Sequence, residues 1–167
     1  MAFARLAVAA VLPVLVVAGV ASAKEPTNLT GDWKGSGFVQ KDDASNKIGV
    51  RCDVVGNQSG DEVGFSGICR AMLVVRRSIG ADIVRNGSDY TGTYVGSLEG
   101  GVAQLSGTQV SPNRIELEMT FEHAVNGDDK AEMIILTDGN EGFSIETRDR
   151  MENGATVVTS SVDFRRN

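Results

Sequence analysis

The stretch that decides the fold is CDVVGNQSGDEVGFSGIC, residues 52–69. Its centre, Gly60-Asp61, has the composition of a two-residue β-turn. Pairing the flanking residues outward from this turn places Cys52 directly opposite Cys69. At that distance from the turn the two cysteines form a non-hydrogen-bonded pair, in which the Cα atoms approach within bridging range. The stretch therefore predicts a β-hairpin that is closed by a Cys52–Cys69 disulfide.

Turn dipeptides recur along the rest of the chain, and short runs with alternating apolar residues separate them. Such spacing is typical of a β-sandwich or β-barrel. We expect an all-β fold, an antiparallel up-and-down β-barrel of eight to ten strands that is lipocalin- or avidin-like in outline. The stretch Ala71–Val84 is ambiguous, because its apolar residues fit a buried strand, an irregular crossover or one helical turn. The turns are Asn86-Gly87, Gly100-Gly101, Pro112-Asn113, Asn126-Gly127, Gly139-Asn140 and Asn153-Gly154.

The same turns predict which residues face the interior. Centring one hairpin on Gly139-Asn140 pairs Leu136 with Phe143, and centring the next on Asn153-Gly154 pairs Phe143 with Phe164. The bulk of the inward side chains predicts a filled barrel without a large apolar cavity. Inward glycines such as Gly107 fit either strand curvature or space for a ligand, and we favour curvature. The expected interior comprises Trp33, Val50, Val54, Phe65, Tyr94, Leu105, Leu117, Met119, Phe121, Ile134, Leu136, Phe143, Ile145, Val162 and Phe164.

Residues 1–23 are expected to be a signal peptide that is removed before Lys24. Arg5 supplies the positive charge, an apolar run follows, and Ala21-Ser22-Ala23 fits a cleavage site. The run is too short to predict a membrane span, and no cysteine stands at the cut to carry a lipid. Residues 24–167 are then a single domain in the periplasm, where an oxidising environment favours the disulfide.

Composition excludes several classes of function. The chain has 167 residues and a net charge of −6, so it lacks the basic surface that a nucleic-acid partner requires. His123 is the only histidine, and we interpret it as a structural residue on the apolar face of its strand. With both cysteines paired, the sequence has too few ligands for zinc and no nucleophile elbow, so we expect no metal, no cofactor and no enzymatic activity. The stretch Asp138–Gly142 lacks the glycine that a calcium loop needs, and it is interpreted as a turn.

Four arginines near the C-terminus are the remaining charged feature. Arg148, Arg150, Arg165 and Arg166 lie on neighbouring predicted strands. They fit a solvated outer face better than an anion site. The residues that we single out as possible contacts with a ligand or a partner are Trp33, Tyr94, His123, Arg148 and Arg150.

Several motifs resemble those of small exported β-barrel proteins of alphaproteobacteria. The chain shares the start Gly31–Gly37 with the pattern G-x-W-x-G-x-G, the hairpin cysteines, the segment Gly92–Gly96, and an ending in Arg165-Arg166. This resemblance implies a periplasmic barrel and no particular activity.

Two partial resemblances suggest alternative roles. Gly31-Asp32-Trp33 before a hairpin disulfide is similar to periplasmic barrel inhibitors of secreted proteases, which implies a protein partner and an exposed segment around Lys24–Leu29. Tyr90–Tyr94 looks like an avidin-type strand, but a single tryptophan makes biotin improbable. We therefore expect a non-enzymatic periplasmic barrel with a binding or envelope-support role; the alternatives are a protease inhibitor and a carrier of a small apolar ligand.

Overall fold

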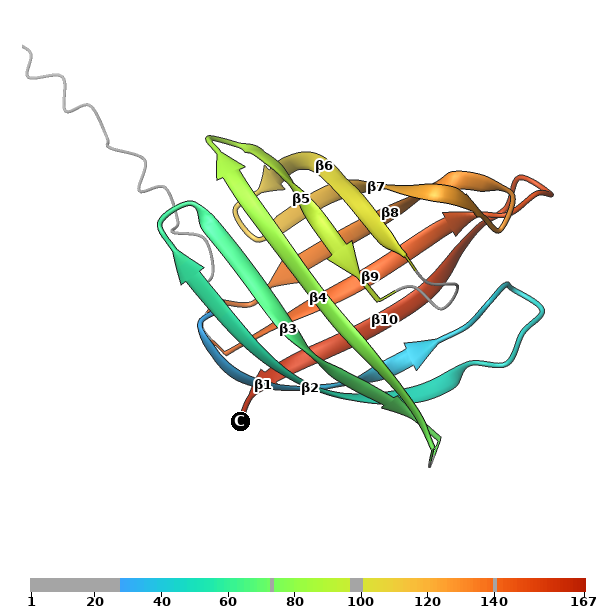
Figure 1. Cartoon of the computed structure of the whole chain (residues 1–167), viewed down its shortest axis with the longest axis horizontal. Coiled ribbons are helices and arrows are strands. Elements are labelled where there is room, and N and C mark those ends of the chain that lie inside the picture. Colours follow the sequence, from blue (N-terminus) through green and yellow to red (C-terminus); the bar gives the residue numbers. More distant parts are fainter. Residues whose placement is uncertain (1–27, 73, 97–100, 140) are drawn as a thin grey trace, which may run out of the picture.

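Ten antiparallel strands follow one another around a closed barrel in the computed structural model, which describes residues 28–72, 74–96, 101–139 and 141–167. Each strand pairs with the next, and β1 pairs with β10 to close the sheet (Figure 1). The predicted all-β barrel is confirmed. In this part of the chain no helix has the length and apolarity needed to cross a membrane. The strands are β1 (Gly31–Val39), β2 (Ile48–Ser59), β3 (Glu62–Ala71), β4 (Val75–Asn86), β5 (Asp89–Val95), β6 (Val102–Ser111), β7 (Arg114–Val125), β8 (Asp128–Thr137), β9 (Gly142–Arg150) and β10 (Thr156–Arg166).

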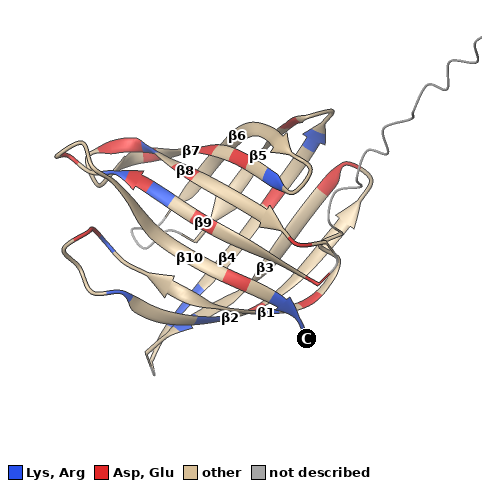
Figure 2. Cartoon of the chain, turned by 180° about the vertical axis from the view of Figure 1, so that it is seen from behind, with Lys and Arg blue, Asp and Glu red and all other residues tan. Residues whose placement is uncertain are grey.

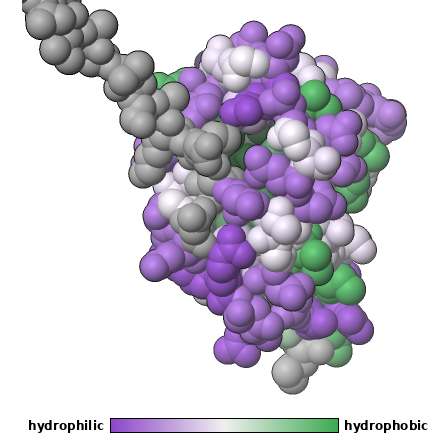
Figure 3. All heavy atoms as spheres, turned by 90° about the vertical axis from the view of Figure 1, so that its left-hand side faces the viewer, coloured by the Kyte–Doolittle hydropathy of each residue, from purple (hydrophilic) through white to green (hydrophobic). Residues whose placement is uncertain are grey.

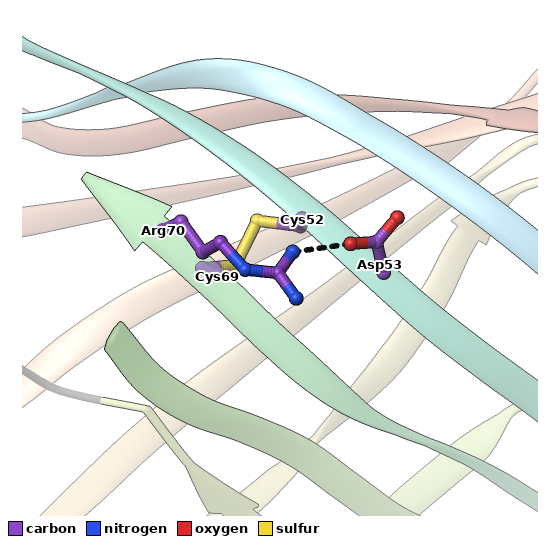
Figure 4. Close-up of a disulfide and its surroundings, with 4 residues drawn as sticks. All are labelled: Cys52, Asp53, Cys69 and Arg70. Atoms are coloured by element: carbon purple, nitrogen blue, oxygen red, sulfur yellow. Dashed lines mark hydrogen bonds and ion pairs between the residues drawn. A yellow bond between two sulfur atoms is a disulfide. The ribbon is translucent and has the colours of Figure 1, made fainter. Parts of the chain in front are cut away.

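The β2–β3 hairpin has the predicted register. Ser59 pairs with Glu62 across the turn, and Cys52 pairs with Cys69, to which it is joined by a disulfide (Figure 4). The ambiguous stretch 71–84 contains the end of β3, a short connection and β4. Met72 has a φ of 51° in this connection, a left-handed conformation that allows the chain to reverse there.

One predicted register is wrong by one residue. Phe143 pairs with Thr137 and not with Leu136. Asp138 and Gly142 are hydrogen-bonded to each other, and three residues separate them in the sequence where the prediction assumed a two-residue turn. The shift turns Met133 and Ile135 into the barrel in place of Ile134 and Leu136. Leu136 is consequently exposed on the outer face, whereas Ile134 is still buried, at 2% exposure, outside the cluster that fills the barrel. The other predicted interior residues are buried or, for Tyr94, half-buried.

Large aromatic side chains fill one end of the barrel, which we call the closed end. Trp33 is 1% exposed, packs edge-on against Phe143 at 5.1 Å, and donates a hydrogen bond of 2.8 Å from Nε1 to the carbonyl of Leu29. Phe143 in turn stacks on Phe164 at 4.6 Å. Arg166 covers the Trp33 ring from outside at 4.4 Å. Viewed toward this end, the described surface is mainly hydrophilic (Figure 3).

Glycine allows neighbouring strands to approach closely where the sheet coils. A Cβ atom added to Gly107 would lie 2.0 Å from the carbonyl oxygen of Glu116 on β7. No real side chain fits at that separation, so this position requires glycine. Curvature is thus the role of Gly107, as the sequence predicted.

Replacement of this glycine provides a test of the coiled geometry. Gly107→Ala should lower the free energy of unfolding by about 2 kcal/mol, because the methyl group must push β6 and β7 apart. Gly49→Ala is the matched control, since a Cβ at Gly49 meets no atom within 4 Å. Urea unfolding should show no loss of stability for that control. Equal stability of the two variants would show that β6 and β7 are not this close.

Candidate functional site

A cavity lies at the other end of the barrel, which we call the open end. Its main part has a volume of about 230 Å³, and an adjoining part of about 90 Å³ extends toward β2, β3 and β4. Val39, Tyr94, Gly96 and Ser160 line both parts, which therefore adjoin each other at these residues. The expectation of an interior without a large apolar cavity is wrong here, whereas toward the closed end the space lined by Leu29 and Phe143 has a volume of only about 50 Å³. Small residues such as Ala71 and Ala131 leave the space at the open end.

The walls of the cavity are apolar on most sides and polar on one. Met119, Phe121 and Val125 of β7 supply apolar surface to the main part. Hydroxyl groups gather where β9 meets β10: the Thr147 hydroxyl lies 3.0 Å from that of Thr159 and 2.7 Å from that of Ser160. An apolar molecule that carries one polar group would match this arrangement.

Asp149 is the buried charged group of the cavity wall. The residue is 4% exposed. Its Oδ2 accepts a hydrogen bond of 2.6 Å from the side-chain amide of Asn126, whereas its buried Oδ1 has no partner among the described residues. Burial raises the pKa of the Asp149 carboxyl above its ordinary value, although hydrogen bonds from the Asn126 side chain and from the Arg150 backbone oppose this rise. An unpaired buried carboxyl oxygen is costly, and a ligand that donates a hydrogen bond would remove that cost.

Tyr94 brings a second polar atom to the junction of the two parts. A Cβ atom added to Gly96 would lie 2.6 Å from the Tyr94 hydroxyl oxygen, so the glycine leaves room for the phenol. Within the described chain, this hydroxyl makes no hydrogen bond. Burial raises the pKa of Tyr94 to about 12, so the phenol stays protonated and its hydroxyl can donate a hydrogen bond to a ligand.

Two irregular strands shape the cavity. The register of β10 shifts between Val158 and Ser160, so that Thr159 and Ser160 both line the space. The register of β7 shifts between Thr120 and Val125. This second irregularity leaves His123 exposed and away from the cavity wall, which corrects its predicted place on the apolar face.

Of the five residues that the sequence singled out as possible contacts, Tyr94 alone lines this cavity. Trp33 lies in the closed end, and Arg148 pairs on the outer face with Glu146 at 2.7 Å. Arg150 is also exposed there. The four C-terminal arginines do not gather, because Arg165 pairs with Asp138 and Arg166 with Trp33 at the closed end.

The polar groups of β9 were missed, although a signal for them was present. Phe143 and Ile145 were expected to face inward, and the alternation of a strand puts Thr147 and Asp149 on the same side. The described residues contain no group of three His, Cys, Asp or Glu side chains that could hold a metal ion. The residues that line the cavity include neither a histidine nor a free thiol.

Comparison with known proteins gives information on the fold of this chain alone. No family model matches the chain, and no curated protein is significantly similar to it in sequence. Among solved structures, the chain is similar to Rv2717c from M. tuberculosis, with a TM-score of 0.63 and 17% identity. The similarity covers 83% of this chain and 92% of that protein.

Removal of the Asp149 charge should stabilise the protein at neutral pH. The raised pKa means that the folded state disfavours ionisation, so the stability of the parent falls as the pH rises through the range in which Asp149 ionises. Asp149→Asn stays uncharged, and Asn126 still finds an amide oxygen to bind. Urea unfolding at pH 7 should therefore give a higher free energy of unfolding for Asp149→Asn than for the parent.

The difference between the two proteins should disappear below the ordinary carboxyl pKa of 3.8, where both side chains are neutral. Asp163→Asn, on the exposed face of β10, controls for the loss of one charge. An Asp149→Asn protein that is less stable than the parent at pH 7 would mean that the carboxylate has a stabilising role.

Proposed function

We propose that this protein is an exported, non-enzymatic binding protein that carries a small, mainly apolar molecule in the open end of its barrel. The observation that carries the proposal is the cavity itself, with its apolar walls and the unpaired Oδ1 of Asp149. A dry engineered cavity of about 150 Å³ binds benzene, so a space of about 230 Å³ with an adjoining part of about 90 Å³ has room for a larger aromatic ligand.

The polar side of the cavity supports a preference for one class of ligand. Asp149 offers an acceptor, and the Tyr94 phenol offers a donor that also accepts. A ligand with an amine or hydroxyl group would satisfy the Asp149 oxygen while its apolar body contacts Met119 and Phe121. An apolar amine fits best, because its charge would also offset the cost of the buried carboxylate.

The contacts at the closed end favour a carrier function over a protease-inhibitor function. A protease inhibitor would need the segment around Lys24–Leu29 to project from the barrel. Residues 24–27 lie outside the described residues, and Leu29 is buried against the barrel with its carbonyl bonded to Trp33. Arg166 also binds the carbonyls of Asn28 and Thr30, at 3.2 Å and 2.9 Å. These contacts make the start of the described chain part of the closed end.

Location in the periplasm is part of the proposal. The predicted signal peptide lies in residues 1–23, outside the described residues. The Cys52–Cys69 disulfide supports an oxidising compartment, because such bonds rarely persist in the cytosol.

Titration with aminoanthracene, a fluorescent apolar amine, tests this function. The parent protein should bind one molecule with saturation. Ala131→Phe should weaken binding by at least about tenfold, the equivalent of 1.4 kcal/mol, because the ring occupies the cavity. Glu132→Phe places the same ring on the adjacent residue, which faces outward, and should bind as the parent does.

Two further variants test the polar contacts. Asp149→Asn should bind the amine less tightly than the parent but bind anthracene, which lacks the amine, equally well. Tyr94→Phe separates the contribution of the phenol hydroxyl from that of the ring. If Ala131→Phe folds and binds aminoanthracene as tightly as the parent, the cavity is not the binding site and the proposal fails.

A further inference from the structure

The tip of the β3–β4 hairpin is the most exposed apolar feature of the described surface. Met72 is 68% exposed and Val74 is 85% exposed. The tip lies at the open end of the barrel and projects beyond the neighbouring strands (Figure 1). Residues at the base of the same hairpin, Ala71 and Val75, line the cavity. The exposed tip is therefore adjacent to the mouth of the cavity.

Arginines occupy the outer face immediately behind this tip. Arg51 of β2 is paired directly with Arg70 of β3, which is paired in turn with Arg76 of β4. Like charges on directly opposed residues of neighbouring strands repel each other and destabilise a sheet. Arg70 forms an ion pair with Asp53, but no acidic partner of Arg51 or Arg76 is present in the described chain. This row of arginines is a feature of the same hairpin that is independent of its apolar tip.

The rest of the molecule makes this cluster unusual. The chain has a net charge of −6, so a row of arginines is not expected from composition. Lysine and arginine segments lie near the β3–β4 tip and along β2, whereas acidic segments are found on β7 and β8 (Figure 2). The basic residues of β7 and β8 have acidic partners, since Arg114 pairs with Glu116 and Lys130 with Glu118, so the arginine row near the tip is the less balanced group.

We propose that the β3–β4 hairpin docks the open end of the barrel on the surface of an anionic phospholipid bilayer. Met72 and Val74 enter the boundary between headgroups and acyl chains, where exposed apolar side chains leave water. Arg51, Arg70 and Arg76 lie behind them at the depth of the phosphate groups, and the anionic lipids relieve the repulsion within the row. An outline of this kind fits a lipid surface better than a protein partner, because the apolar area is a small convex tip and not a broad complementary face.

Docking in this orientation would bring the mouth of the cavity to the bilayer. Arg77 faces the cavity from the same hairpin and would lie between the lipid surface and the interior. The docking proposal does not depend on the carrier function, because its test uses no ligand.

Flotation with lipid vesicles tests the proposal on the processed protein, recovered after the leader has been removed. We expect binding to vesicles that contain phosphatidylglycerol, little binding to pure phosphatidylcholine, and release at high salt, since surface charges are then screened. Met72→Ser combined with Val74→Ser should reduce the bound fraction at least several-fold. Arg51→Gln combined with Arg76→Gln should do the same and should not lower the urea midpoint, because removal of like charges relieves repulsion.

Matched controls distinguish the hairpin from the general surface. Val55→Ser with Val84→Ser removes two exposed valines that lie toward the closed end and should leave vesicle binding unchanged. Arg150→Gln removes an exposed arginine from the open end of β9 and should also have no effect.

Three results would overturn the proposal. The first is the absence of binding to phosphatidylglycerol vesicles by the folded parent protein. The second is binding that persists in both hairpin variants. The third is a dimer in sedimentation that the Met72→Ser, Val74→Ser variant disperses while vesicle binding is absent, which would assign the tip to a second copy of the chain. If any of these results is obtained while the protein still binds aminoanthracene, the docking proposal fails and the carrier proposal stands.

Discussion

The pairing of β1 with β10 is the constraint on which the rest of the structure depends. It joins the first strand to the last over seven residue pairs, from Trp33 with Arg166 to Val39 with Ser160. Because the sheet closes, no edge strand is left to seek another partner, and every strand must coil around a common interior. The close approach at Gly107 follows from that coiling. The two ends of the closure also place Trp33 at one end of the barrel and Val39 at the other, where it lines the cavity.

Closure around ten strands creates an interior that ordinary side chains fill only in part. An eight-stranded barrel is just wide enough to be filled, and the interior widens as strands are added. Here Trp33, Phe143 and Phe164 pack against one another at the closed end, whereas smaller residues such as Ala131, Thr147 and Ser160 are among those that line the mouth. The expectation of a filled interior was wrong because it rested on the total number of bulky inward residues and not on their positions along the barrel axis. Their uneven distribution along the barrel axis produces the cavity.

The sequence predicted the architecture well, because turn dipeptides set strand pairing in a meander. Gly60-Asp61 located the disulfide register, and Asn153-Gly154 correctly paired Phe143 with Phe164. The same reasoning failed at Gly139, where one extra residue in the connection reverses the face of every residue in the paired strand. It failed again at His123, because the sequence carries no signal for the irregularity in β7. The candidate site depended on those irregularities, so only Tyr94 was anticipated there.

Two unfavourable features lie at the open end, and Gln58 near the closed end carries a further buried oxygen without a partner. The unpaired oxygen of Asp149 lowers the stability of the isolated protein. The row Arg51, Arg70 and Arg76 carries like charges, of which Arg70 alone has an acidic partner among the described residues. At the closed end, Trp33 has its hydrogen bond and its aromatic contact. Proteins tolerate such costs where a ligand or surface removes them on binding. A donor in the cavity would satisfy Asp149, and anionic lipid would neutralise the arginine row. The two proposals therefore assign ligand binding and membrane docking to the same end of the barrel.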